Sequence, residues 1–426
     1  MLILRKLEGI TFYFSIFFIS IQLGKHFWPD FAFVQGIRLD YLSPTLYLSD
    51  IFVLLFVFIH IANNFSLFFK FISKSFVLPF FLFSLLVSSL FAQNVDASIY
   101  WSLKVIEIIL FGFCIAHFSF SRKSFYVLID ILISASLIQS IIALLQFLFQ
   151  KSLGGPLYFL GERSFGIDTI GIATFFANGK EFLRPYGTFA HPNILALFLS
   201  TTLIFLLFIV LKEKRGKRVN FYSISFLPIF LALLLTASRL IIFLTFVFAF
   251  LAFAKSKKHL LYAFFGAVTI LPVYFILLSE RFLTLGALLE AFEIRITFIT
   301  SSISVLQSNL IFGVGPNNTF YNTVFNSLLP IYARFQPVHN VYLQILLQIG
   351  VLGAIPTVIF LAKNFEKAIG ATVKRKKFLL ILSLLFFEIS IVGVFDHFLV
   401  TLQQGMLLSA LILGLLSNKS MEQVSD

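Results

Sequence analysis

The segment Arg184-Pro-Tyr-Gly-Thr-Phe-Ala-His191-Pro-Asn193 places an arginine, a histidine and an asparagine directly before a long apolar stretch. Pro192 suits the first turn of a helix, where its missing N–H costs nothing. The free amides and the positive dipole end of that helix attract an anion, and Arg184 adds a positive charge. Arg184, His191 and Asn193 are therefore candidates for binding a phosphate group. The alternative is that His191 only caps the helix.

A second candidate segment is His339-Asn340, which is followed after nine residues by Gly350 and then by Gly353. On a continuous helix, Gly350 and Gly353 lie about 20° and about −40° from His339, so all three share one face. Glycines on such a face let a neighbouring helix approach closely. A lone histidine is usually structural, but a pKa near neutrality also lets His339 remove a proton from a hydroxyl group.

Two further groups lie at the ends of apolar stretches. Arg239 follows Thr236-Ala237-Ser238 between two such stretches, and Asp396-His397 ends another. Asp396 and His397 form a second acid/base candidate. We rank this pair below His339 because no glycine pattern accompanies it.

The composition shows what kind of protein must position these residues. Of 426 residues, 59% are hydrophobic and only 12% are charged, which is too little polar material to coat a soluble core. The net charge of +13 arises from short basic strips between apolar runs, a placement that indicates membrane insertion rather than nucleic-acid binding. The single cysteine, Cys114, excludes a disulfide framework.

The apolar runs predict an all-α, polytopic transmembrane bundle of about twelve spans. We place the spans near residues 10–23, 50–66, 76–92, 98–118, 125–150, 189–211, 221–238, 240–254, 260–278, 340–362, 378–395 and 399–416. Two outer segments are long, 151–188 and 279–338, and the second contains an amphipathic stretch, Leu285 to Leu306, that we expect to form a lid or platform. We divide the chain into N-terminal spans (1–188), a core (189–362) and C-terminal spans with a tail (363–426).

The basic residues orient this bundle. With the N-terminus inside, the inner loops hold 21 lysines and arginines and the outer loops hold ten, which fits the positive-inside rule. The inner residues are 5 Arg and 16 Lys, whereas the outer ones are 7 Arg and 3 Lys. Arginine outside indicates bidentate recognition of phosphate or carboxylate, unless these side chains only anchor helix ends. Arg184 and Arg239 lie where an outer loop meets a span, at the depth of a lipid diphosphate.

Two charged features inside or beside the spans have simpler interpretations. Lys104 and Glu107 are three residues apart within the fourth span, so we expect an intramembrane ion pair. Asp50 opens the second span and is interpreted as a helix cap.

Four motifs together resemble the O-antigen ligase and O-antigen polymerase superfamily. They are the Arg184-to-Asn193 segment, the Thr236-Ala-Ser238-Arg239 hairpin, the Phe312-Gly-Val-Gly315 turn and the His339-Asn340-x9-Gly350-x2-Gly353 signature. The resemblance is strong over residues 184 to 360. Ala354 departs from the ligase signature, which more often has Gly, Thr or Tyr there.

The resemblance implies a metal-independent glycosyltransferase without cofactors, at the outer face of the cytoplasmic membrane. The implied donor is a glycan on undecaprenyl diphosphate, and the acceptor is a lipid A core or a second lipid-linked glycan. The resemblance assigns catalytic roles to Arg184, Arg239 and His339. It makes Arg295 a weaker candidate, which we group with His191, Asn193 and Asn340 as substrate-binding residues. No D-x-D motif occurs in the outer loops, which agrees with dispensing with a metal ion.

A transporter or flippase of lipid-linked oligosaccharides is the alternative, because transporters also carry ionisable groups within the membrane. Only the pair Lys104 and Glu107 is in such a position, so we favour the enzyme. The sequence does not separate a ligase from a polymerase.

Overall fold

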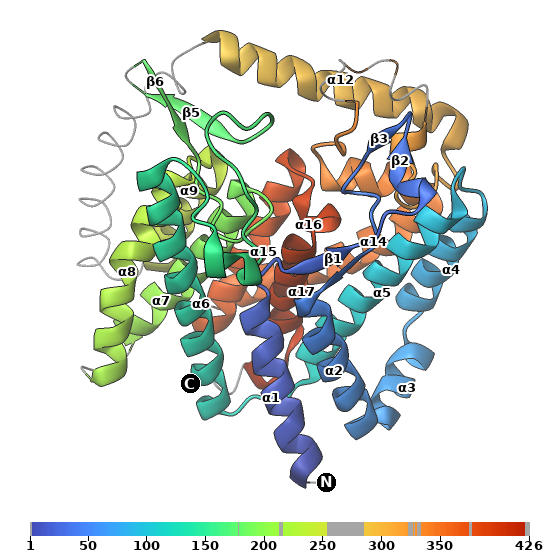
Figure 1. Ribbon diagram of the computed structural model, residues 1–426. Coiled ribbons are helices and arrows are strands. Elements are labelled where there is room, and N and C mark those ends of the chain that lie inside the picture. Colours follow the sequence, from blue (N-terminus) through green and yellow to red (C-terminus); the bar gives the residue numbers. More distant parts are fainter. Residues whose placement is uncertain are drawn as a thin grey trace.

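The computed structural model describes residues 2–177, 179–212, 216–253, 285–322, 327, 329, 334–374 and 377–421. In these residues the protein is mostly helical, with three short two-stranded sheets. Figure 1 shows most helices running side by side between two ends of the molecule. The predicted fold class, a helical membrane protein, is thus confirmed. Helices form from the apolar runs because a helix bonds all of its own peptide groups where no water is available.

The helices that run between the two ends overlap eleven of the predicted spans. Their bounds are α1 (Leu2–Phe18), α2 (Leu48–Asn63), α4 (Val77–Leu90), α5 (Val95–His117), α6 (Arg122–Phe149), α7 (Pro192–Lys212), α8 (Lys217–Leu235), α9 (Arg239–Phe253), α14 (Val341–Lys374), α15 (Lys377–Phe395) and α17 (Gln403–Ser417). The predicted span 260–278 and the basic strip at 255–258 lie outside the described residues.

The predicted count of about twelve spans is not confirmed. Six of the described helices are long and apolar enough to cross a membrane, and the pair formed by α2 and α3 (Phe65–Lys74), bent by 92°, makes a possible seventh. The helices α4, α9 and α17 are apolar but shorter.

The segments predicted to lie outside the membrane gather at one end of the molecule, which we call the outer end. There α12 (Leu285–Asn309) crosses the top of the bundle, beside the hairpin of β5 (Thr174–Ala177) and β6 (Lys180–Leu183) (Figure 1). The N-terminus and α3 lie at the opposite, inner end. The stretch predicted from Leu285 to Leu306 lies within the helix α12, and its role as a lid or platform stays a prediction.

The segment between α1 and α2 folds into small strands that the sequence analysis did not predict. The strands are β1 (Gly24–His26), paired antiparallel with β4 (Thr45–Tyr47), and the hairpin of β2 (Phe33–Val34) and β3 (Ile37–Arg38). Tyr41 of this segment stacks on Phe320, with 5.8 Å between the ring centroids. Aromatic packing thus attaches the segment to the outer part of the chain that follows α12.

Two enclosed helices hold the centre of the bundle. The most apolar stretches of α7 and α15 are 78% and 67% buried, and both helices are apolar on all sides, as expected for helices surrounded by others. Because α7 begins and α15 ends at the outer end, the residues next to these termini, His191 and Asp396, are held together above the core.

Gly350 interrupts α14. Its φ of 60° and ψ of −169° are not helical and are accessible almost only to glycine. A preceding turn approaches this break, where the N–H of Val351 donates to the carbonyl of Leu310 (2.9 Å). A Cβ on Gly350 would lie 2.2 Å from the carbonyl oxygen of Ile311. Gly350 therefore permits a backbone-to-backbone approach that no other residue allows.

The prediction that His339, Gly350 and Gly353 share one face of a continuous helix is wrong. His339 precedes the start of α14 at Val341, and the break at Gly350 changes the helix phase. The space at Gly350 is used by a turn rather than by a neighbouring helix. A Cβ on Gly353 would meet Ile349 of the same helix at 2.4 Å.

Gly350→Ala is expected to destabilise the protein by more than about 3 kcal/mol, because it adds backbone strain to a steric clash. Thermal unfolding in detergent measures the effect. Gly370→Ala, also in α14 but with nothing within 4 Å of the added Cβ, is the matched control and should be neutral or slightly stabilising. Equal unfolding midpoints for the two variants would contradict the role given to Gly350.

Candidate functional site

Arg184 is buried at the outer end, where it joins parts of the chain that are distant in sequence. Its side chain is only 5% exposed. Nε donates a hydrogen bond to the carbonyl oxygen of Thr236 (2.6 Å), and Nη2 donates to Oδ1 of Asn193 (2.7 Å). Thr236 caps the end of α8, and the half-buried Arg239 begins α9 three residues later. Arg184 therefore fixes the hairpin that carries Arg239.

Asn193 connects Arg184 to a carboxylate. Its Nδ2 donates to Oδ2 of Asp396 (2.8 Å) while its Oδ1 accepts from Arg184, so both halves of the amide are used and its orientation is determined. Asp396 follows the last residue of α15, and its Oδ1 accepts the backbone N–H of His397 (2.8 Å). We call Arg184, Asn193 and Asp396 the polar row.

Three histidines surround Asp396 and interact with it electrostatically: His191, His339 and His397. We call Asp396 and these three histidines the cluster. The rings of His339 and His397 are 5.0 Å apart, with their planes at 84°. Nδ1 of His191 accepts the backbone N–H of Asn193 (3.1 Å). Nδ1 of His339 is buried and has no hydrogen-bond partner among the described residues. Ring packing against Phe298 and His397, rather than a hydrogen bond through Nδ1, thus accompanies the burial of His339.

Burial lowers the pKa of these histidines, because a charged imidazolium loses its water. The pKa of His397 falls to about 4, and those of His191 and His339 fall below their ordinary value despite the opposing charge of Asp396. Burial alone would raise the pKa of Asp396, but the three histidines and Asn193 outweigh it and lower the pKa. At neutral pH the site therefore combines a carboxylate with neutral imidazoles that can accept a proton.

Asn340 and Arg295 lie beside this cluster in different roles. Asn340 caps α14, with Oδ1 accepting the N–H of Leu343 (2.9 Å), and its Nδ2 donates to the carbonyl of Val394 (3.1 Å). It therefore connects the start of α14 to the end of α15. Arg295, on α12, has its guanidinium 6.0 Å from the ring centroid of Phe395 and is exposed. Its charge contributes to lowering the pKa of the buried His339.

The predicted charge pair within the membrane is separate from this cluster. Lys104 contacts Glu107 (3.2 Å) and forms a second ion pair with Asp50. Asp50 also accepts the backbone N–H of Tyr47 (2.8 Å), so its predicted role as a helix cap is confirmed. Among the described residues, no group of three or more His, Cys, Asp and Glu side chains is suited to hold a metal ion.

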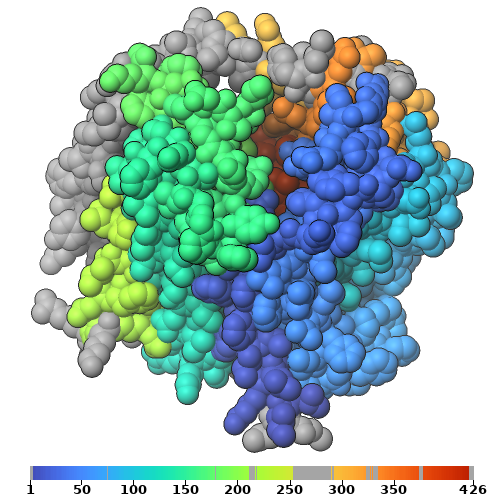
Figure 2. Space-filling model, in the orientation of Figure 1, coloured from blue at the N-terminus to red at the C-terminus, as the bar shows by residue number. Residues whose placement is uncertain are grey.

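The outer end is hollowed above the cluster. Figure 2 shows the hollow between the segment 151–188, coloured green, and the segment 24–47, coloured blue, with red C-terminal residues visible at its floor. The red element at this place in Figure 1 is α16 (Phe398–Thr401), which directly follows His397. Tyr41, from the second segment, reaches His397, with 5.8 Å between the ring centroids. His191, His339 and Asp396 are only partly buried, whereas His397 is buried at 7% exposure.

Residues 224–358 match the O-antigen ligase family. This stretch of the chain is therefore similar to the O-antigen ligase family. The match lies within the region whose motifs carried the resemblance, and it contains Arg239, Arg295 and His339. No curated protein matches the chain. Arg184, Asn193 and Asp396 of the polar row lie outside the matched residues, so the assignment of the polar row depends on the contacts described above.

The structure thus brings together Arg184, His191, Asn193 and His339, which the sequence analysis selected. It also raises the importance of Asp396 and His397, which we had ranked lower. Their sequence signal was an acidic residue and a histidine at the outer end of a span. Tyr41 was missed, and nothing in the local sequence distinguishes it from the other tyrosines.

Proposed function

We propose that the protein is a membrane glycosyltransferase that moves a glycan from undecaprenyl diphosphate to a hydroxyl acceptor, at the outer face of the cytoplasmic membrane. The observation that carries this proposal is the polar row with three histidines around Asp396, beside the hairpin of Arg239. The arginines supply positive charge that stabilises a departing diphosphate. The neutral imidazole of His339 accepts the proton of the acceptor hydroxyl.

The reaction breaks the bond between the sugar carbon and the phosphate oxygen and forms a bond from that carbon to the acceptor oxygen. His339 accepts the acceptor proton, and Asp396 stabilises the imidazolium that results. Negative charge grows on the leaving diphosphate. Arg239, with Arg184 behind it, stabilises that charge more in the transition state than in the ground state.

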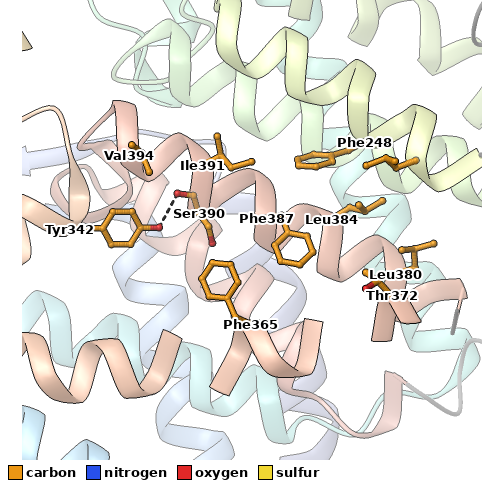
Figure 3. A pocket seen from close by; sticks show the side chains of 11 residues that line it. Phe248, Tyr342, Phe365, Thr372, Leu380, Leu384, Phe387, Ser390, Ile391 and Val394 are labelled. Atoms are coloured by element: carbon orange, nitrogen blue, oxygen red, sulfur yellow. Dashed lines mark hydrogen bonds between the residues drawn. The ribbon is translucent and has the colours of Figure 1, made fainter. Parts of the chain in front are cut away.

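An apolar cavity offers a path for the lipid chain of the donor. It has a volume of about 1100 Å³ and lies between α9, α14 and α15. Figure 3 shows Phe248, Phe365 and Phe387 around it, with the hydroxyl of Tyr342 donating to the carbonyl of Ser390 (2.8 Å). The α15 residues that line it extend from Leu380 to Val394, about 21 Å along the helix. Val394 is two residues from Asp396, so a prenyl chain here places its diphosphate near the polar row.

Purified protein in detergent, supplied with a lipid-linked glycan and an acceptor, tests the proposal. Transfer without any sealed vesicle supports the enzyme, whereas glycan movement that strictly requires a membrane barrier supports a transporter. The product then separates the two enzyme types. A ladder of lengthening lipid-linked chains indicates a polymerase, and a single transfer to a different lipid indicates a ligase.

The pH dependence of transfer should have an acid limb with a midpoint below the ordinary histidine value of 6.5, because protonated His339 cannot accept a proton. Asp396→Asn removes a charge that raises the pKa of His339, so the limb should move to lower pH. Measurements of kcat/KM between about pH 5 and pH 8 reveal both effects. A midpoint above 6.5, or movement of the limb to higher pH in Asp396→Asn, would contradict His339 as the base.

A further inference from the structure

Arg163 belongs to the segment 151–188, which borders the hollow in Figure 2. Its Nη2 donates a hydrogen bond to the carbonyl oxygen of Ala190 (2.9 Å), the residue before His191. Its guanidinium carbon lies 5.4 Å from the centroid of the Tyr186 ring. These two contacts hold the guanidinium near the start of α7 while its side chain remains exposed.

The loop that carries Arg163 is fastened by its buried neighbour Glu162, which is 6% exposed. Oε1 of Glu162 accepts from Nε2 of Gln146 (2.8 Å) and from the N–H of Leu153 (2.8 Å), and Oε2 accepts from the N–H of Gly154 (2.7 Å). A carboxylate that accepts three hydrogen bonds is firmly held. Arg163 is thus presented by a fixed loop, so little conformational freedom is lost when it binds a ligand.

Arg163 also interacts electrostatically with Tyr41, which belongs to the segment on the other side of the hollow. Burial raises the pKa of Tyr41, Asp396 raises it further and Arg163 lowers it, so Tyr41 lies within the electrostatic reach of both charges. The ring of Tyr41 packs against that of His397. The guanidinium of Arg163 is therefore close to the cluster and exposed to water, whereas Arg184 approaches the cluster from the buried side.

The charge of Arg163 has no acidic partner within ion-pair distance in the part of the chain that the structure describes. A guanidinium has five N–H donors, and the described residues accept one of them, through Ala190. An exposed arginine that is held in place and has unused N–H donors is suited to bind a planar or tetrahedral anion.

We propose that Arg163 is an anion-binding residue at the entrance to the site, where it holds a phosphate or carboxylate of the glycan substrate. The identity of the ligand as a glycan substrate rests on the proposed function. Two sources supply this chemistry: the diphosphate of the donor and an acidic sugar in either glycan.

Equilibrium binding to the full chain in detergent tests the inference with two probes, farnesyl diphosphate and a hyaluronan tetrasaccharide, at low ionic strength. Arg163→Gln should weaken the binding of at least one probe about tenfold, and Arg163→Lys should weaken it less because the charge remains. Raising the salt concentration should reduce the difference, since the residue is exposed. Thermal unfolding verifies that each variant is folded.

Arg38→Gln is the matched control. Arg38 is also an exposed outer arginine, stacked over Trp28 with 4.5 Å from its guanidinium carbon to the ring centroid, and its loss should leave binding unchanged. Weaker binding of farnesyl diphosphate alone in Arg163→Gln identifies the donor as the source of the anion, and weaker binding of the tetrasaccharide alone identifies an acidic sugar. Unchanged binding of both probes, equal losses in Arg38→Gln, or wild-type protein that binds neither probe would overturn the inference. Protein that passes this test but transfers no glycan would refute the proposed function and leave the role of Arg163 standing.

Discussion

His339→Ala is expected to lower the rate of glycan transfer by about 10²- to 10⁴-fold, the usual contribution of a positioned general base. The histidine is buried next to His397 and Asp396, and burial keeps its pKa below the ordinary value, so it is neutral and able to accept a proton at pH 7. Single-turnover rates with a radiolabelled lipid-linked glycan measure the loss. His339→Gln retains a polar side chain of similar size and should be equally inactive.

The control for this variant is His117→Ala. His117 is an exposed histidine at the end of α5, where its Nδ1 bonds the carbonyl of Phe113 (2.9 Å). Its loss should change the rate by less than about threefold, which is within experimental scatter. Activity within the same range in His339→Ala would remove His339 from the mechanism. If His397→Gln then proved inactive, the base would be the second imidazole, 5.0 Å away.

Arg239→Ala is expected to lower the transfer rate by about 10²- to 10³-fold, the cost of losing one donor that stabilises developing negative charge. Arg239 begins α9, and the bond from Arg184 to Thr236 fixes the turn before it. The loss should appear mainly in kcat, because the diphosphate gains most of its charge in the transition state. Steady-state kinetics with varied donor concentration separate kcat from KM.

Arg184→Lys tests the second arginine without removing the positive charge from the polar row. It keeps the cation but cannot bond Thr236 and Asn193 with one planar group, so it should also reduce kcat. Arg122→Ala, at the start of α6 on the inner side, is the control for loss of an arginine and should retain activity. A purely higher KM in Arg239→Ala, with kcat unchanged, would show that this arginine binds the donor without stabilising the transition state.

The sequence was most informative where chemistry and local pattern coincide. It identified Arg184, His191, Asn193 and His339 because charged or polar residues at the ends of apolar runs are rare and costly. It failed at Gly350, where the helical wheel assumed a continuous helix and the structure has a break. A glycine pattern alone does not distinguish close helix packing from a backbone turn that inserts into a helix.

By itself, the sequence determined that the protein is helical and built for a membrane, and it identified the resemblance to the O-antigen ligase family that the match at residues 224–358 supports. These properties follow from composition and from the spacing of residues along the chain. Only the tertiary structure decided that Asp396 meets Asn193 and Arg184, and that the loops of Tyr41 and Arg163 form the walls of the entrance. The physical reason is that these contacts depend on how α7 and α15 are rotated and aligned against each other. That alignment is set by packing between residues about two hundred positions apart, which no local pattern records.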